Sequence, residues 1–137
     1  MGQSDIIVLS QMSPKTEKII NNLAKQAEGL PQPIHVIAVC SGGKTVGKQM
    51  AKYFKSHKIK ASYHEVWTNI VDGKASVWKS DFKKKDYTGT ALIAEDVIWN
   101  GKSVNATKRM LREMKRQKPY VAVILDCNHK ADFANFR

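Results

Sequence analysis

The chain has 137 residues, the usual size of one domain, and we expect residues 1–137 to form a single domain rather than a larger multidomain enzyme. Lysine and arginine number 23 against 12 aspartates and glutamates, a formal net charge of +11, and 42% of the residues are hydrophobic. This composition excludes a disordered chain and predicts a folded, basic protein that attracts anions. Both halves of the chain are basic, so the charge belongs to the folded body and not to a tail.

Alternating helices and strands are the main feature of the hydrophobic pattern. After a short apolar run at 6–9, Ser13 and Pro14 are typical of the start of a helix. In chain order, the pattern predicts a helix over about 14–28, a buried strand over 34–40, a helix over about 44–56, an alternating strand over 59–67, a buried strand over 90–94, a polar loop over 95–102, a helix over 103 to about 117 and a buried strand over 120–125. This order favours an α/β protein with a mostly parallel sheet, whose ligands bind at the carboxyl ends of the strands.

One long segment, about 68–88, interrupts this alternation. It contains few apolar residues, the turn-forming pair Asp72-Gly73 and three consecutive lysines. Unstructured segments of this length inside small domains are usually functional lids or disordered. We expect a long exposed loop or a mobile ribbon here.

The cysteines and the N-terminus indicate the compartment. Cys40 and Cys127 each end an apolar run and have no partner at metal-ligand spacing, so we expect both to be reduced and buried. The first residues lack the charged start and apolar run of a signal peptide, and no stretch approaches the ~20 apolar residues of a membrane span. A cytoplasmic protein without membrane contact is expected.

Chemistry concentrates where the strand over 90–94 ends. Two adjacent carboxylates, Glu95 and Asp96, come first, and Trp99-Asn100-Gly101-Lys102-Ser103 then leads into a helix. The carboxylates can accept hydrogen bonds from sugar hydroxyls or hold Mg²⁺. Backbone N–H groups of the glycine-containing turn, together with the helix dipole, can hold a phosphate. A ribose 5-phosphate needs both functions.

The stretch ALIAEDVIWNGKS resembles the phosphoribosyl diphosphate (PRPP) signature of type I phosphoribosyltransferases. In addition, VIAVCSGGKTVGKQMAKYF resembles the pyrophosphate loop of that family, and LSQMSPKTEKIINNLA resembles the first helix of its small xanthine-guanine-type members. The resemblance covers nearly the whole chain. It implies a single-domain α/β fold in which a mostly parallel sheet is flanked by helices and a mobile hood, about 68–88, lies near the site.

The resemblance also implies roles for individual residues. Glu95 and Asp96 would be the catalytic pair that contacts the ribose hydroxyls and binds Mg²⁺ as the cofactor. The phosphate loop, defined as Trp99, Asn100, Gly101, Lys102 and Ser103, would bind the 5-phosphate of PRPP. The pyrophosphate loop, defined as Ser41, Gly42, Gly43 and Lys44, would bind the leaving group, and the lysine-rich part of the hood, about 74–85, would close over it.

The implied reaction transfers ribose 5-phosphate from PRPP to a nucleobase, with a 6-oxopurine as the first choice, and releases pyrophosphate. The expected partners are therefore PRPP and a nucleobase or nucleoside monophosphate, and by analogy a second copy of the chain in a homodimer. Trp99-Asn100 stands where purine-converting relatives often have Asp-Thr, which removes a possible general base. The alternative is a catalytically degenerate protein of this fold that senses a nucleotide or PRPP, or binds nucleic acid as a regulator.

Three further patterns allow other interpretations. Gly42 to Lys48 nearly matches a nucleotide-binding P-loop, but Gln49 replaces the hydroxyl that would bind Mg²⁺, which argues against it. His35 lies in a buried strand and is expected to be a core residue. The helix from Ser103 carries many cations, which form either a solvated face or a nucleic-acid footprint: Lys108, Arg109, Arg112, Lys115 and Arg116, with Lys118 just beyond.

Overall fold

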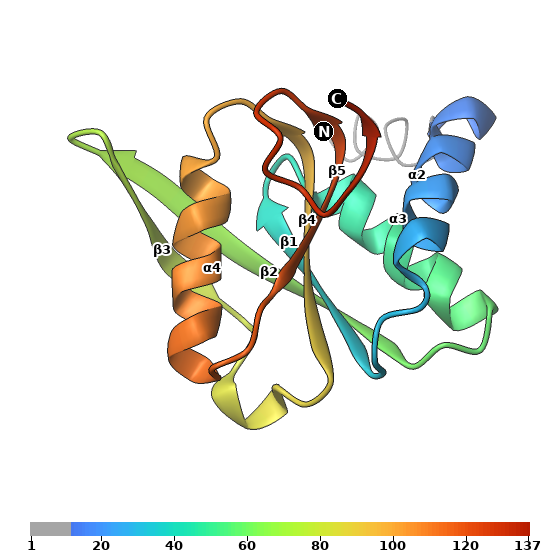
Figure 1. The fold of residues 1–137 in the computed structure, drawn as a ribbon, viewed down its shortest axis with the longest axis horizontal. Helices are drawn as coiled ribbons and strands as arrows, with labels where there is room; N and C mark the ends of the chain where they lie inside the picture. Colours follow the sequence, from blue (N-terminus) through green and yellow to red (C-terminus); the bar gives the residue numbers. More distant parts are fainter. Residues whose placement is uncertain (1–11) are drawn as a thin grey trace, which may run out of the picture.

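A six-stranded sheet forms the centre of the protein, and its strand order is β3-β2-β1-β4-β5-β6 (Figure 1). The computed structural model describes residues 12–137, so the apolar run 6–9 lies outside the described residues. The elements are α2 (Pro14–Ala27), β1 (Ile34–Cys40), α3 (Lys44–Ser56), β2 (Ala61–Val71), β3 (Lys74–Ser80), the 3-10 turn η1 (Lys84–Asp86), β4 (Thr90–Ile98), α4 (Lys102–Met114), β5 (Tyr120–Asp126) and β6 (Phe133–Phe136).

Parallel pairing dominates the sheet. Strand β1 lies in the middle and pairs in parallel with β2 on one side and with β4 on the other. β4 and β5 are also parallel, as are β5 and β6, whereas β2 and β3 form an antiparallel hairpin. The expected mostly parallel α/β sheet is confirmed.

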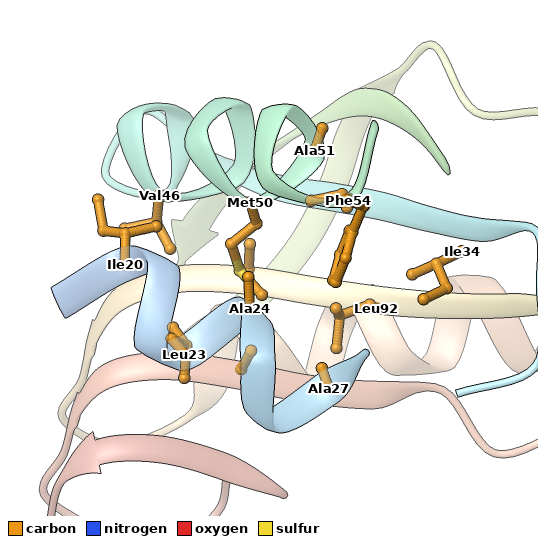
Figure 2. Packing of buried hydrophobic residues seen from close by; sticks show 13 residues of the cluster. Ile20, Leu23, Ala24, Ala27, Ile34, Val46, Met50, Ala51, Phe54 and Leu92 are labelled. Atoms are coloured by element: carbon orange, nitrogen blue, oxygen red, sulfur yellow. The ribbon is translucent and has the colours of Figure 1, made fainter. Parts of the chain in front are cut away.

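The two faces of the sheet are covered by different helices. Alternate β1 residues separate cleanly, since Ile34 and Val36 belong to the core under α2 and α3, whereas Ile37 and Val39 belong to the core under α4. Figure 2 shows the first core, in which Met50 and Phe54 of α3 pack with side chains of α2 and β4; they include Ile20, Leu23 and Leu92, all fully buried. Burying each of these large side chains contributes about 1.5–3 kcal/mol to folding.

The N-terminal helix is specified locally. The Ser13 Oγ accepts a hydrogen bond from the Thr16 backbone N–H at 3.0 Å, and Pro14 follows directly in the first turn. This cap satisfies one of the free N–H groups at the start of α2. The helix boundaries expected from the sequence are confirmed to within one residue.

The segment 68–88 is largely a hairpin rather than a loop. Strand β2 continues to Val71, the chain turns at Asp72 and Gly73, which have φ values of 52° and 77°, and β3 returns. An Asp-Gly pair suits such a tight turn because both central residues need positive φ. The end of β2 and all of β3 were missed, because their residues do not alternate cleanly and three apolar ones, Ile70, Val71 and Trp78, are exposed. The mobility expected of this segment remains a prediction.

Three other expectations need correction. Strand β4 runs to Ile98, so Glu95 and Asp96 lie within the strand and not in a loop after it, because they continue the pairing with β5. The short strand β6 was not expected. Cys127 is exposed, because the buried residue at the end of β5 is Asp126, and Cys40 at the end of β1 is only partly buried. No helix of residues 12–137 is long and apolar enough to cross a membrane.

Candidate functional site

The pyrophosphate loop and the carboxylate pair meet at the carboxyl edge of the sheet. β1 and β4 are adjacent and parallel, so the loop after β1 lies beside the end of β4. A Cβ atom at Gly42 would lie 2.8 Å from the Asp96 Oδ1 and 2.9 Å from the Glu95 Oε1. The absence of a side chain at Gly42 therefore lets the loop rest against both carboxylates.

Gly43 is confined by backbone instead of side chains. A Cβ there would lie 2.9 Å from both the N and the O of Val39 and even closer to the Ala94 carbonyl oxygen. The Gly43 N–H donates to the Val39 carbonyl at 2.8 Å, and the peptide bond between Cys40 and Ser41 is cis. This tight turn brings the start of α3, which has no side-chain cap, to the edge where the carboxylates lie.

Glu95 and Asp96 are coupled to each other. The Asp96 N–H donates to the Glu95 Oε1 at 3.0 Å, and the Val97 N–H donates to the Asp96 Oδ1 at 2.8 Å. Burial and the neighbouring Asp96 carboxylate raise the pKa of Glu95 to about 8. A cation placed here would favour the charged form of Glu95, since an opposite charge lowers the pKa of a carboxyl group.

The same pair fits a magnesium ion whose remaining ligands come from a substrate. Among residues 12–137, no three histidine, cysteine, aspartate or glutamate side chains lie close enough to hold a metal ion by themselves. Mg²⁺ characteristically binds one or two protein carboxylates and completes its shell with water and substrate phosphates. Glu95 and Asp96 would be the protein ligands of such an ion, and water and substrate would supply the others.

The phosphate loop has the shape of an anion-binding turn. Gly101 has a φ of 78°, and the Asn100 Oδ1 accepts a hydrogen bond from the Lys102 N–H at 2.9 Å just before α4 begins. A hollow of about 260 Å³ is lined by this loop together with Glu95 and Ile70. Trp99 is 72% exposed and does not fill the interior of the loop. The loop and one of the two carboxylates therefore share one hollow.

The hairpin contacts the phosphate loop and α4, and its closure as a hood over the pyrophosphate loop remains a prediction. The Thr68 hydroxyl donates to the Ser103 Oγ at 3.1 Å, and the Lys102 Nζ donates to the Gly73 carbonyl at 3.0 Å. The polar groups of Lys102 and Ser103 are thus directed at the hairpin. The Lys102 N–H already donates to the Asn100 Oδ1, so an anion at this helix start would be bound by the other backbone N–H groups.

The remaining pyrophosphate-loop residues differ in their surroundings. Ser41 is exposed at the edge. The Lys44 Nζ lies 3.9 Å from the Glu65 Oε2 and 5.7 Å from the centre of the Trp67 ring, so it points toward β2 and away from the carboxylate pair. The structure thus brings Gly42 and Gly43 to Glu95 and Asp96, but it does not place the Lys44 amine with them.

A buried aspartate that the sequence did not single out organises the loop beside the site. The Asp126 carboxylate accepts N–H groups of the loop at 2.9–3.2 Å and the Arg137 guanidinium at 3.1 Å; the donors are Asn128, Lys130 and Ala131. Burial opposes ionisation of Asp126, but these donors outweigh it and lower its pKa. The side chain of Lys130 then passes over Gly101, where a Cβ would lie 3.4 Å from the Lys130 Cδ. The signal in the sequence was an aspartate at the end of an apolar strand.

Comparison with solved structures shows the fold, whereas no family model and no curated protein matches the sequence. A hypoxanthine-guanine phosphoribosyltransferase from Bacillus anthracis has a TM-score of 0.68 and 21% identity, over 88% of this chain and 75% of that one. The corresponding enzyme of L. donovani has a TM-score of 0.72 and 15% identity, over 86% and 77% of the two chains. A Trypanosoma cruzi hypoxanthine phosphoribosyltransferase has a TM-score of 0.69 and 15% identity, over 88% and 72%. The chain therefore has the type I phosphoribosyltransferase fold that its sequence resembles.

Proposed function

We propose that this protein binds PRPP with Mg²⁺ at the carboxyl edge of the sheet and transfers ribose 5-phosphate to a nucleobase. The observation that carries the proposal is the position of Glu95 and Asp96 between two glycine turns, each of which starts a helix. Such an arrangement places acceptors for sugar hydroxyls between two sites that favour anions. PRPP has this distribution of groups, with a phosphate at one end and a pyrophosphate at the other.

Each part of the site has one task in this proposal. Backbone N–H groups of residues 99–103, apart from that of Lys102, hold the 5-phosphate in the hollow of about 260 Å³. Glu95 and Asp96 accept the ribose hydroxyls and hold Mg²⁺, which supplies positive charge to the pyrophosphate oxygens when it is bound. The turn at residues 41–43 directs the N-terminus of α3 at the leaving group.

In the transfer step, the bond between the ribose anomeric carbon and the pyrophosphate oxygen breaks, and a bond to a ring nitrogen of the base forms. The base nitrogen gives its proton to water, and pyrophosphate leaves with the electron pair of the broken bond. A 6-oxopurine is the proposed acceptor because the solved structures of this fold named above are hypoxanthine or hypoxanthine-guanine phosphoribosyltransferases.

A second candidate is binding of PRPP or a nucleotide without transfer. It is favoured by the composition of the phosphate loop, which has no carboxylate, and by Asn100, whose side-chain oxygen is already bonded to the Lys102 N–H. No acidic group of the loop is available to take a proton from the base. In this case the protein would be a sensor.

Calorimetric titration with PRPP, with and without Mg²⁺, tests the binding step. Asp96→Asn removes one charge at the site, and we expect it to reduce Mg²⁺-dependent affinity at least tenfold while the thermal unfolding midpoint changes little. Asp72→Asn makes the same chemical change at the exposed hairpin turn and should bind like the wild type. Wild-type affinity in Asp96→Asn would contradict the assignment of the site.

Pyrophosphate release separates the two candidates. The wild-type protein is incubated with PRPP, Mg²⁺ and, in turn, hypoxanthine, guanine, xanthine, adenine and orotate. Release with a 6-oxopurine alone supports the proposed transferase. Tight PRPP binding without release with any of these bases supports the sensor.

A further inference from the structure

A row of lysines runs along α3, away from the carboxylate pair. Its members are Lys44, Lys48, Lys52 and Lys55, which are three or four residues apart and therefore lie on one side of the helix. At 1.5 Å per residue the row is about 16 Å long. No aspartate or glutamate occurs in residues 44–64, and Glu65, which follows, lies beside Lys44 at one end of the row.

Most of this lysine row has no carboxylate partner within the described part of the chain. Lys44 lies 3.9 Å from the Glu65 Oε2, whereas no carboxylate of residues 12–137 lies within ion-pair distance of the other three lysines. Lys48, Lys52 and Lys55 are exposed and line a hollow of about 530 Å³ together with Tyr63. Three cations thus converge on one depression of the surface.

An aromatic row lies beside the lysines and consists of Tyr63, Trp67 and Trp78. The Lys48 Nζ is 5.9 Å from the centre of the Tyr63 ring, and the Lys44 Nζ is 5.7 Å from that of Trp67. The rings of Trp67 and Trp78 are 6.4 Å apart, and Trp78 is 59% exposed. The aromatic row therefore continues from α3 onto the hairpin.

Two features of the fold bring these rows together. Helix α3 packs closely on β2, and one face of the β2–β3 hairpin has no helix of residues 12–137 over it. A Cβ atom at Gly47 would lie 3.0 Å from the Tyr63 Cε1, so glycine lets α3 approach the ring. Tyr63 belongs to the core on the α3 face of the sheet, whereas Val77 packs into the core on the α4 face. The pairing of β2 with β3 shifts at Trp67 and Thr68, which leaves Trp78 unpaired at a bulge. Its ring lies beside that of Trp67, which Lys44 of α3 covers, so Trp78 belongs to the α3 side. Helix α4 covers only the other face of the hairpin (Figure 1).

We propose that the lysine row and the aromatic row together bind single-stranded nucleic acid. Lysines that lack carboxylate partners attract the phosphates, and the exposed Trp78 ring, with the half-buried rings of Trp67 and Tyr63 beside it, stacks on unpaired bases. Proteins bind single strands in this way without reading their sequence. A duplex suits this surface less well, because its bases already stack on each other. The surface meets the proposed PRPP site only at Lys44, and the three lysines tested below lie outside that site.

The basic face of α4 is less suited to this ligand. The Arg109 Nη2 donates to the Ala75 carbonyl at 3.1 Å, and the Lys118 Nζ lies 2.8 Å from the Asp132 Oδ1. The Lys115 Nζ lies 5.4 Å from the centre of the Tyr87 ring, which is buried and cannot stack on a base. Helix α4 therefore offers positive charge without an exposed stacking ring.

Tryptophan fluorescence, titrated with oligo(dT) and oligo(U) of about 15 nucleotides at several salt concentrations, tests the proposal on the full chain. We expect saturable quenching whose affinity falls steeply with salt. The triple variant K48A/K52A/K55A should bind more weakly, and its plot of log affinity against log salt should be shallower by about 2, because each phosphate that a lysine neutralises adds ~0.7 to the slope. Alanine preserves the helix at these exposed positions, and circular dichroism checks the fold.

Two matched controls test whether binding depends on this surface and not on net charge or on any exposed aromatic residue. R112A/K115A/R116A removes three charges from α4 and should bind like the wild type. Trp78→Ala should lower affinity about tenfold, whereas Phe136→Ala, at an exposed aromatic residue outside both surfaces, should not. A stronger signal with oligo(U) or with oligo(dT) supports the proposal either way and identifies RNA or DNA as the ligand.

Several results would overturn the proposal. Absence of binding to both oligonucleotides at low salt would do so, and so would equal losses in the α3 and α4 triple variants, which would indicate net charge alone. Equal affinity for a duplex of the same length, together with no effect of Trp78→Ala, would exclude stacking on this surface.

Discussion

The carboxyl edge of the sheet and its amino-terminal half each contain a cluster of polar side chains, but only one of them is open. At the carboxyl edge, Glu95 and Asp96 lie beside two glycine turns, and Glu95 lines a hollow. In the amino-terminal half, the Ser62 Oγ lies 2.6 Å from the His35 Nδ1 and 2.8 Å from the His64 Nε2. The His64 Nδ1 lies 3.3 Å from the Asp81 Oδ1, which completes a chain of four groups.

This histidine cluster, defined as His35, Ser62, His64 and Asp81, has the order of an Asp-His-Ser triad without its surroundings. The rings of His35 and His64 pack on Phe82 at 5.2 and 4.8 Å between ring centres, and His35 is only 7% exposed. A nucleophile needs a site where a reacting atom can lie, and the cluster is filled by Phe82 instead. The difference teaches that space for a substrate, more than the identity of the polar groups, separates a candidate site from a polar network packed against a core ring.

The largest expected effect comes from closing the tight turn at the carboxyl edge. We expect Gly43→Ala to lower the free energy of unfolding by about 3 kcal/mol, because its Cβ would collide with the backbone of two strands. Gly42→Ala is the matched control, since its Cβ meets only carboxylate side chains that can move. Urea denaturation of both variants measures the difference, and equal stability would contradict the packing described for this turn.

The histidine cluster should be structural, with no part in ligand binding. Ser62→Ala removes the hydroxyl between the two histidines and should cost about 1–3 kcal/mol, because the His35 Nδ1 loses its partner in a buried position. PRPP affinity should stay at the wild-type value. A large loss of PRPP binding in a folded Ser62→Ala protein would show that the two clusters are not independent.

The phosphate loop should tolerate a side chain better than the pyrophosphate loop does. Gly101→Ala must adopt a φ of 78°, which costs about 1 kcal/mol, but nothing approaches its Cβ closer than 3.4 Å. The thermal unfolding midpoint of Gly43→Ala should therefore be well below that of Gly101→Ala. The reverse order would mean that backbone conformation costs more stability than the tertiary contacts at Gly43 do.

The smallest expected effect is a dependence of stability on pH that originates in the histidine cluster. Burial lowers the pKa of His35 below its ordinary value of 6.5, and the neighbouring His64 adds to this. Between the two pKa values the unfolded chain binds more protons than the folded one, so stability falls as the pH decreases below about 6.5. His35→Asn should weaken this dependence in thermal melts between pH 5 and pH 7, values chosen to bracket about 6.5. If stability depends on pH as steeply in His35→Asn as in the wild type, other groups cause the dependence.

Much of the fold could be predicted because its central strands are continuous apolar runs. β1 was expected with its observed bounds, since Ile34–Cys40 is buried on both faces and shows almost no polar interruption. The hairpin and β6 could not be predicted in this way. Their residues are largely exposed or half-buried, and they become strands only because a neighbouring strand offers free backbone groups.

The candidate site also has parts that the sequence predicts and parts that depend on tertiary contacts. The carboxylate pair and the phosphate loop are contiguous in sequence, and Asn100 and Gly101 form their turn with local hydrogen bonds and a local φ. Lys44 was expected at the pyrophosphate, but its position depends on Glu65 and Trp67 of the neighbouring strand. The buried Asp126 escaped attention for the same reason, because its Arg137 partner is eleven residues away.

The sequence by itself therefore determined the features that depend on near neighbours. These are the helical and strand periods, the Ser13 cap of α2 and the glycine turn at the start of α4. Only the tertiary structure decided which side chains meet across strands and helices, such as Gly42 with Asp96 and Lys48 with Tyr63. The physical reason is that local conformation follows from the backbone preferences of adjacent residues, whereas these contacts follow from the order and direction of the strands.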